Sequence, residues 1–205
     1  MNVGEAMGAK IIIDSATCIA VLIKEHFQIN YYMAICSNNS NNRKSYASIE
    51  LNYDLLKTEV DLNAFQHIQL ASEAAISSKN RAITHNKGIM NGVIALALAT
   101  GQDTRALESA IHFFANDSGI DGYGPLSFWE QDGNILKGHI CLPTPVSVVG
   151  HLIKTHDHVQ HNFQIMGYPT AKTLGELLAC VGLASNFAAL LQLVSGIFIE
   201  SSNKG

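Results

Sequence analysis

Basic and amide side chains crowd the segment from Arg81 to Asn91, which also contains His85 and Lys87. The segment leads into residues 88–101, which carry no charged side chain and are predicted to form a helix buried on all sides. A lysine at the N-terminal mouth of such a helix can stabilise a developing oxyanion, because the free N–H groups there favour negative charge. An ordinary polar first turn of a helix is the alternative interpretation.

Asp103 follows the apolar helix at its other end, where its carboxylate could hold and polarise a lysine. A continuous helix over residues 88–101 would place its ends roughly 20 Å apart. Contact between Lys87 and Asp103 of one chain then requires a break at Gly88 or Gly92, or a partner subunit. We therefore hypothesise a site shared between two subunits, although an aspartate after Gly-Gln can also be a simple loop residue.

The motif THNKGIMNG at residues 84–92, followed by ALATGQD, resembles the signature of class II 3-hydroxy-3-methylglutaryl-CoA (HMG-CoA) reductases. The resemblance implies that Lys87 is the catalytic lysine, which stabilises the thioester oxyanion, and that Asp103 is the catalytic aspartate that supports it. It also implies that Arg81 and Asn91 bind the substrate.

The resemblance extends over nearly the whole chain. Residues 4–10 are similar to the family's cofactor motif and imply that Glu5, Met7 and Gly8 help to seat NAD(P)H, together with Asn38. The similarity does not distinguish NADH from NADPH.

Two later segments are also similar to the family. Residues 123–129 form one, and residues 181–190 form the other, which implies a substrate-binding role for Asn186. The family interconverts HMG-CoA and mevalonate with NAD(P)H, and CoA is a further small-molecule partner. A homodimer or a higher oligomer is the expected assembly.

The departures from the family pattern carry equal weight. The family's catalytic glutamate precedes the cofactor motif, and this sequence begins at that motif. The family's catalytic histidine follows the late helix, and no histidine occurs here after His161; Lys10 and Ser185 also replace a usual Asn and Gln. We therefore expect a chain truncated at its N-terminus that is incomplete or inactive alone, with a separate N-terminal half as one possible partner. The alternative is a non-catalytic remnant that binds a dinucleotide or pairs with another subunit.

Local patterns predict the elements that must position these residues. Alternating or branched residues indicate strands at 29–36 and 46–55, with a polar loop at 37–45 between them, and a hairpin at 126–142 turning at Asp132-Gly133. Apolar periodicity predicts helices at 6–26, 63–77 with Asp61 as N-cap, 88–101 ending at Gly101, 104–115, 151–166 and 171–199.

The resemblance implies an α+β fold, in which a partial ferredoxin-like cofactor-binding domain (residues 1–60) is attached to a larger mixed helix/sheet catalytic domain (residues 61–205). A truncated first strand would leave an open sheet edge, and apolar surface on the central helix would be exposed. Such surfaces predict association with another chain.

Composition and local sequence argue against several other classes of protein. The net charge of −4 and the scattered basic residues argue against a nucleic-acid-binding protein. We see no signal peptide. The uncharged stretch 180–199 is interrupted by the polar residues Ser185, Asn186, Gln192 and Ser195, which favours a packed helix over a membrane span.

The four scattered cysteines predict reduced, mostly buried thiols in a cytoplasmic protein. The histidines at 156–161 are interpreted as surface residues, with no metal site expected.

Overall fold

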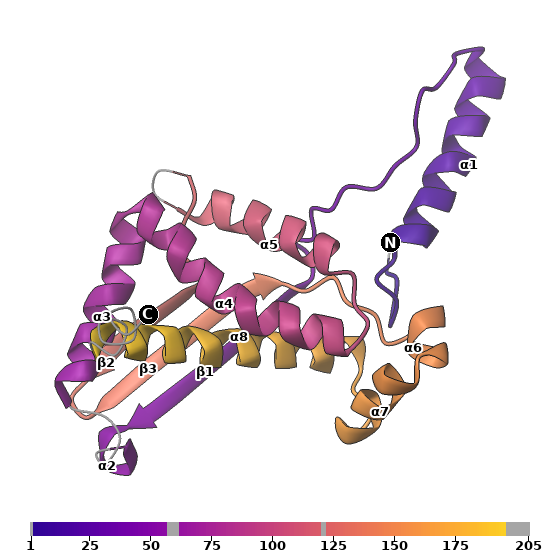
Figure 1. The fold of residues 1–205 in the computed structure, drawn as a ribbon. Helices are drawn as coiled ribbons and strands as arrows, with labels where there is room; N and C mark the ends of the chain where they lie inside the picture. The colour runs from indigo at the N-terminus through magenta and orange to yellow at the C-terminus, as the bar shows by residue number, and fades with distance from the viewer. Residues whose placement is uncertain (1, 57–61, 120–121, 196–205) are drawn as a thin grey trace, which may run out of the picture.

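The computed structural model describes residues 2–56, 62–119 and 122–195 (Figure 1). The strands are β1 (Lys44–Asn52), β2 (Ser127–Asp132) and β3 (Ile135–Pro143). The helices are α1 (Ala9–Phe27), α2 (Tyr53–Leu56), α3 (Leu62–Ser77), α4 (Lys79–Ala99), α5 (Thr104–Ser118), α6 (His151–Thr155), α7 (Asp157–Ile165) and α8 (Ala171–Val194). The expected mixture of helix and sheet is confirmed.

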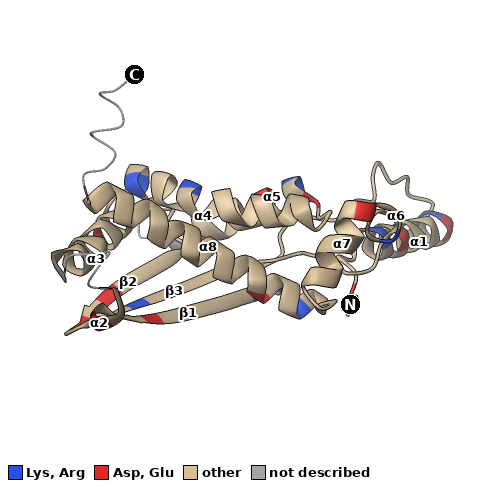
Figure 2. Cartoon of the chain, turned by 60° about the horizontal axis from the view of Figure 1, so that its bottom comes forward, with Lys and Arg blue, Asp and Glu red and all other residues tan. Residues whose placement is uncertain are grey.

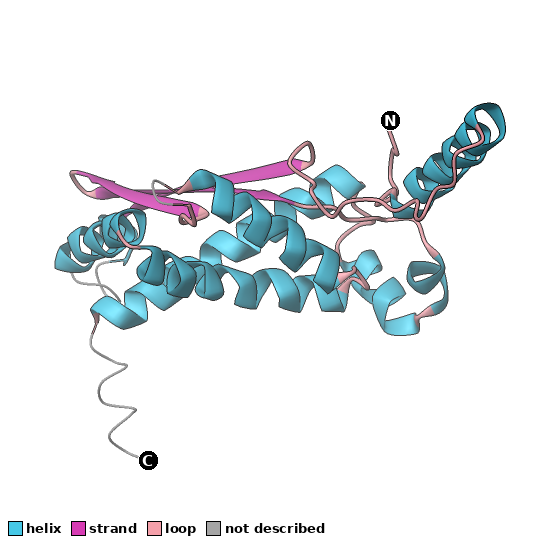
Figure 3. Ribbon diagram, turned by 90° about the horizontal axis from the view of Figure 1, so that it is seen from above, coloured by secondary structure: helices cyan, strands magenta, loops and turns pink. Residues whose placement is uncertain are grey.

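The strands form one antiparallel sheet in the order β1-β3-β2. The hairpin of β2 and β3 turns at Gly133, whose φ of +58° a glycine adopts without steric cost. This confirms the hairpin predicted from Asp132-Gly133. Figure 3 shows the helices that pack on the sheet gathered on one of its faces, whereas α1 lies apart from it.

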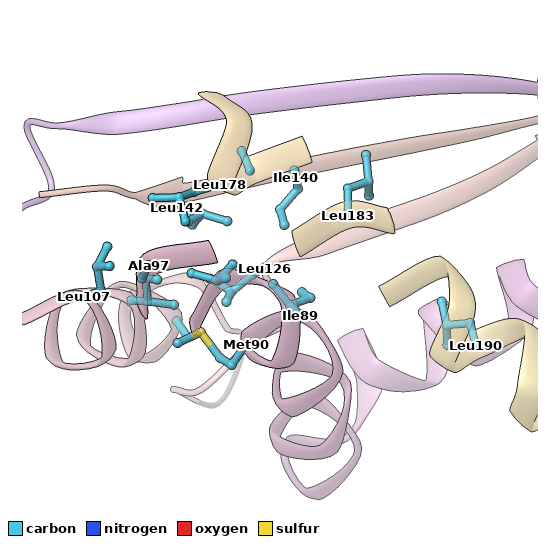
Figure 4. Close-up of a cluster of buried hydrophobic side chains, with 14 of the residues drawn as sticks. Ile89, Met90, Ala97, Leu107, Leu126, Ile140, Leu142, Leu178, Leu183 and Leu190 are labelled. Carbon is cyan, nitrogen blue, oxygen red and sulfur yellow. The ribbon is translucent and has the colours of Figure 1, made fainter. Parts of the chain in front are cut away.

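Alternate residues of β3 point toward the helices. Leu136, Ile140 and Leu142 are buried, whereas His139 between them is exposed. Their side chains meet Ile89 of α4 and other apolar residues of α4 and α8 in the core drawn in Figure 4. The period of two along the strand therefore decides which face of the sheet is covered.

Glycines allow α4 and α8 to cross at close range. A Cβ atom on Gly92 would lie 2.1 Å from Ser185 Oγ, and one on Gly182 would lie 3.0 Å from Val93 Cγ2. Gly88 is similarly close to Ala189, at 3.3 Å. These glycines mark a helix crossing, and the break that we considered at Gly88 or Gly92 does not occur, because α4 continues through both positions.

Helix α8 has the length and apolar composition of a membrane-spanning helix, a test that core helices of soluble proteins also pass. In this structure it packs against α4, β1 and β3, burying Leu174, Leu178 and Leu190. Figure 2 shows its charged residues confined to its first turns. This packing agrees with the prediction of a packed helix.

Several local expectations were wrong. Residues 29–36 form no strand, because no described strand lies beside them to take up their backbone hydrogen bonds. The helix expected at 151–166 is two helices, separated by the extended His156. Asp61, the expected N-cap of α3, and the end of the helix expected to reach residue 199 lie outside the described residues.

The strand pairing bears on where the expected N-terminal domain ends. Strand β1 pairs with β3 along its whole length, from Lys44 opposite Pro143 to Asn52 opposite Ile135. A division at residue 60 would separate these paired strands, so we propose that the N-terminal unit ends before Lys44. This unit consists of α1 and the irregular segment that follows it, and Figure 1 shows α1 projecting away from the sheet.

Several apolar side chains and two cysteines are exposed on the surface of this chain. Helix α1 buries none of its residues, and Leu22 and Phe27 are more than half exposed. On the central helix α4, Leu98 is likewise exposed, in line with the expected exposure of apolar surface on this helix. Asn91 and Ala95 are exposed as well, so the prediction that residues 88–101 are buried on all sides was wrong. All four cysteines are free, but Cys18 and Cys180 are exposed and the other two are only partly buried, so the prediction of mostly buried thiols was wrong.

Candidate active site and cofactor site

Lys87 lies in the middle of α4, and the prediction that it stands at a helix N-terminus was wrong. The helix begins eight residues earlier, where Ser78 Oγ caps it by accepting a hydrogen bond from Arg81 N at 3.4 Å. Neither proline nor glycine interrupts residues 79–87, so the polar segment continues the helix. Lys87 therefore projects from the side of the helix and gains nothing from the helix dipole.

Lys87 and Asn91, four residues apart on one face of α4, share an open hollow of about 500 Å³. Glu108 and His112 line the same hollow from α5. An ammonium, an amide, a carboxylate and an imidazole thus converge on one space, which is the set of groups needed for polar catalysis on a carbonyl. Sequence reasoning missed Glu108 and His112, although their i, i+4 spacing in a predicted helix could have indicated a shared face.

His112 is oriented by a neighbour. Its Nδ1 lies 2.7 Å from the hydroxyl of Tyr123, and the two rings stack at 6.0 Å. This contact leaves Nε2 as the ring nitrogen available to a molecule in the hollow.

Arg81 is not brought to this hollow. It lies six residues before Lys87, about a third of a turn around the helix. Burial lowers the pKa of its guanidinium, and its charge acts on the neighbouring His85.

Asp103 is separated from Lys87 within one chain. Its Oδ1 caps α5 by accepting hydrogen bonds from the backbone N–H groups of Arg105 and Ala106, each at 3.1 Å. The helix from Lys87 to Ala99 alone spans roughly 18 Å at 1.5 Å per residue. The unbroken helix thus keeps the two groups apart within one chain.

The turn between α4 and α5 is held by a residue that sequence reasoning passed over. Gly101 ends the helix with φ of +65°, as predicted. Gln102 then donates to the carbonyls of Thr100 and Ser147 and accepts from Ser147 N at 2.8 Å. This bridge fixes Asp103 relative to the segment after β3.

Met7 and Asn38 line one cavity of about 190 Å³ between the first loop and residues 36–43. Ser37 and Asn39 also line it. Gly8 adopts φ of +101° at the start of α1, and a Cβ there would lie 2.7 Å from Val3. The polar amides and the free N–H groups at the start of α1 fit a phosphate-bearing cofactor.

Arg43 clamps this cavity, and its role was not foreseen. Its guanidinium donates to the carbonyls of Ala6 and Met7, each at 2.9 Å, and to that of Val146 at 3.1 Å. Burial lowers the pKa of Arg43, and the negative charge of Glu5 partly offsets that effect. The only sequence signal was its place in the densest basic pair, Arg43-Lys44.

Glu5 is turned away from the cavity. Its Oε2 accepts a hydrogen bond from Ala171 N at 2.6 Å, at the N-terminus of α8. A carboxylate there is stabilised by the positive end of the helix dipole. Glu5 therefore joins the loop before α1 (residues 2–8, the candidate cofactor loop) to α8 and does not face the space that Met7 and Asn38 share.

Asn186 lies inside the protein, apart from Lys87 and Asn91. It is 1% exposed, and its Oδ1 accepts hydrogen bonds from Ser127 Oγ at 2.8 Å and from Trp129 Nε1 at 2.7 Å. In this structure the side chain joins α8 to β2, and it offers no surface to a substrate.

His85 extends this buried network. Trp129 Nε1 can only donate, so Asn186 presents its oxygen, and the single proton of Ser127 also goes to that oxygen. His85 Nε2, 2.7 Å from Ser127 Oγ, must therefore carry a proton and donate it. Burial and the charge of Arg81 lower the pKa of His85 from 6.5 to about 4, so the ring is neutral at pH 7.

Asn86 completes the attachment of α4. Its Nδ2 donates to the carbonyl of Gly124 and its Oδ1 accepts from Leu126 N, both at 2.9 Å. His85 and Asn86 together fix the rotation of α4 about its axis. That rotation is what turns Lys87 and Asn91 outward.

The histidines at 156–161 lie on the surface around α7, and the rings of His156 and His158 are 5.8 Å apart. Among the described residues, no group of three or more His, Cys, Asp or Glu side chains is arranged to hold a metal ion.

Comparisons with known proteins agree with this architecture. A structure of 3-hydroxy-3-methylglutaryl-coenzyme A reductase from Streptococcus pneumoniae matches with a TM-score of 0.86 and 36% identity, covering 94% of this chain and 46% of that one. A class II reductase structure from the same organism, bound to NADPH, matches equally well and is covered over 53% of its chain.

Curated relatives give the same result. The chain is 37% identical to a probable 3-hydroxy-3-methylglutaryl-coenzyme A reductase of Borreliella burgdorferi, with 92% of this chain aligned, and 36% identical to the reductase of Archaeoglobus fulgidus, with 95% aligned. It spans 44% of the length of each relative. The family model described as hydroxymethylglutaryl-coenzyme A reductase matches residues 1–204. The chain belongs to the hydroxymethylglutaryl-coenzyme A reductase family.

The neutral, buried His85 predicts a specific pH dependence of stability. Between pH 6.5 and pH 4 the unfolded chain takes up a proton that the folded chain does not. The free energy of unfolding therefore decreases as the pH is lowered from 6.5 to 4. The loss should total about 3 kcal/mol. His85→Gln keeps an amide N–H near Ser127 but does not titrate. Urea unfolding at several pH values should show a smaller loss for this variant, and equal losses would contradict the assignment.

Proposed function

We propose that this chain carries the NAD(P)H-binding loop and the lysine-bearing helix of an HMG-CoA reductase, which interconverts HMG-CoA and mevalonate. One observation carries the proposal: Lys87, Asn91, Glu108 and His112 converge on one hollow in a chain of this family. The NADPH-bound relative supports a nicotinamide cofactor without deciding between NADH and NADPH. The free cysteines are compatible with a reducing cytoplasm.

Each group in the hollow has a distinct role. Bound NAD(P)H would supply hydride to the carbonyl carbon of the substrate. The Lys87 ammonium would stabilise the negative charge that then develops on the carbonyl oxygen, because fixed charges act strongly in a site from which water is excluded. Asn91, on the same face, would donate or accept a hydrogen bond that orients the substrate beside Lys87. Arg81, which lies outside this hollow in one chain, would contact a more distant part of HMG-CoA.

His112 and Glu108 provide acid–base groups within the described residues. The Tyr123 hydroxyl orients the imidazole of His112, so that its Nε2 could deliver a proton to a departing CoA thiolate. Glu108, one turn earlier on α5, could hold the imidazolium through its charge. These two residues are the acid–base candidates that the hollow of Lys87 itself contains.

Asp103 is proposed to act across a subunit boundary. In one chain it caps α5, with Lys87 beyond reach along α4. In a symmetric dimer, Asp103 of one protomer could approach Lys87 of the other and hold its ammonium in the charged state.

A second candidate function is dinucleotide binding without turnover, in which the chain serves as a binding or subunit-pairing module. The self-contained cavity of Met7 and Asn38, clamped by Arg43, favours this alternative, since it needs no other chain to form.

The cofactor site is tested by binding. Asn38→Ala should raise the dissociation constant for NADPH or NADH by about tenfold, because it removes a hydrogen-bonding amide from the cavity wall. Asn91→Ala, in the other hollow, is the matched control and should leave this constant unchanged. Fluorescence titration measures both. Equal affinities for wild type and Asn38→Ala would exclude this cavity as the cofactor site.

Turnover is tested through His112. HMG-CoA-dependent oxidation of NAD(P)H should fall by about 10²–10⁴-fold in His112→Asn, which retains a contact to Tyr123 but cannot deliver the proton. Tyr123→Phe keeps the imidazole and should lose far less. Full activity of His112→Asn would remove His112 from the mechanism. Cofactor binding with no turnover by the wild type would instead support the non-catalytic alternative.

The shared site is tested by mixing subunits. Lys87→Ala and Asp103→Ala should each be inactive alone, but unfolding and refolding them together should restore about a quarter of wild-type activity. Half of the dimers would then be mixed, and each mixed dimer would contain one intact site and one doubly altered site. No recovery after mixing would place both residues in the same chain's site.

A further inference from the structure

The face of the sheet that points away from the packed helices carries side chains capable of nucleophilic and acid–base chemistry (Figure 3). Cys141 and His139 flank the buried Ile140 along β3, so both side chains point to this other face. Tyr46 of β1 lies directly opposite Cys141, and Ser48 lies opposite His139. Strand alternation and register thus make neighbours of a thiol, an imidazole and two hydroxyl groups.

These side chains border an open hollow of about 670 Å³, which is here called the sheet hollow. Its volume is in the range of sites that bind small molecules. Phe128 of β2, opposite His139, forms an aromatic wall, and Ile76 of α3 and Pro125 before β2 close one end. The sheet hollow therefore combines reactive polar groups with apolar walls. It shares no lining residue with the hollow of Lys87.

Cys141 needs a base before its sulfur can act as a nucleophile. Burial raises the pKa of the Cys141 thiol, and a hydrogen bond from the Tyr46 hydroxyl and the charge of Lys44 offset this only in part. The sulfur is therefore a thiol at neutral pH, whereas the reactive form is the thiolate. His139 offers the base, because Cα atoms two residues apart on a strand are roughly 7 Å from each other and both side chains share one face. A thiol beside an imidazole is an arrangement used to activate a nucleophile.

We propose that the sheet hollow is a second reactive site, in which Cys141 accepts the acyl group of an uncharged acyl thioester. His139 is the general base, and the Tyr46 and Ser48 hydroxyls are the hydrogen-bond donors beside the reacting carbonyl. The proposal does not rest on the function proposed for the hollow of Lys87, since the two hollows are built from different residues.

The reaction exchanges one thioester for another. The imidazole of His139 takes the proton of the Cys141 thiol, and the sulfur forms a bond to the carbonyl carbon. Negative charge develops on the carbonyl oxygen, where the hydroxyl of Ser48 or Tyr46 can donate a hydrogen bond. The bond from this carbon to the sulfur of the carrier then breaks, and the carrier thiolate takes the proton from His139. One thioester is consumed and one is made, so no oxidant, reductant or further co-reactant is required.

Charge on the neighbouring part of the sheet selects the kind of acyl group. Glu50 and Glu130 lie on either side of Lys137 on the same face, one row beyond Ser48 and His139. The single ammonium of Lys137 is already bound to Asp132 at 2.9 Å, so the row carries excess negative charge. An acyl group that ends in a carboxylate would be repelled there, whereas an apolar acyl chain can lie against the aromatic and aliphatic walls of the sheet hollow.

Acyl transfer is tested with octanoyl-CoA and the purified chain. Mass spectrometry of the intact protein should show the addition of one octanoyl group, and peptide mapping should locate it on Cys141. The adduct should be absent in Cys141→Ser and should form at the wild-type rate in Cys180→Ser. This second variant is the matched control, because Cys180 is also a free cysteine and is more exposed than Cys141. Circular dichroism checks that both variants keep the fold.

The role of His139 is tested by removing and replacing the imidazole. His139→Ala should acylate Cys141 about 10²-fold more slowly than the wild type, because the thiol loses its general base. Free imidazole added to this variant should restore part of the rate, a recovery that a purely structural role for His139 would not produce. His161→Ala, which alters an exposed histidine of α7, should react like the wild type with or without imidazole.

The choice of acyl group is tested by comparing two thioesters of the same carrier. Octanoyl-CoA should acylate Cys141 faster than HMG-CoA, whose acyl group ends in a carboxylate, and Glu50→Gln should narrow the difference by raising the rate with HMG-CoA.

Three results would overturn the proposal. The first is a wild type that gains no octanoyl group. The second is an adduct that forms as fast on Cys180 as on Cys141, which would mark an indiscriminate reaction of accessible thiols. The third is a His139→Ala variant that reacts at the wild-type rate.

Discussion

The attachment of α4 to α8 and to β2 is the constraint on which the arrangement depends. Glycines in both helices let their backbones approach, and a methyl group at Gly92 would overlap Ser185. The buried hydrogen bonds of His85 and Asn86 then fix the rotation of α4 about its own axis. Only one rotation satisfies both, because unpaired polar groups in the core are costly. The outward direction of Lys87 follows from that rotation.

The same core connects the two candidate sites. Glu5 fastens the cofactor loop to the N-terminus of α8, and the middle of α8 carries Asn186, which joins the buried network beneath α4. Arg43 and Gln102 tie the cofactor loop and the α4–α5 turn to neighbouring parts of the segment after β3. A displacement of α8 would therefore be felt in both the cavity of Met7 and the hollow of Lys87. The candidate cofactor site and the candidate substrate site are thus connected through α8.

The edges of the sheet and helix α1 differ in how much of their surface the rest of the chain covers. Side chains of α3 bind the backbone of one edge of the sheet, whereas β1, at the other edge, lies beside an apolar groove and pairs with no further strand among the described residues. Helix α1 adds exposed apolar residues at the other end of the molecule. Such surfaces are covered when proteins assemble, since exposed strand edges and apolar patches favour association.

The sequence by itself determined the family, the β2–β3 hairpin and most helices, because these depend on local motifs, turn chemistry and short-range periodicity. The motifs also predict that Met7 and Asn38 act together, and both line one cavity in the structure, while their role in binding a cofactor stays a prediction. It could not decide that Lys87 lies in mid-helix, that Glu5 faces α8 or that Asn186 is buried, since each depends on which elements pack together. Nor could it reveal that residues 29–36 form no strand, or that Glu108 and His112 share the hollow of Lys87. Those outcomes were decided by tertiary contacts, through the availability of pairing partners and the rotation of α4 and α5 against each other.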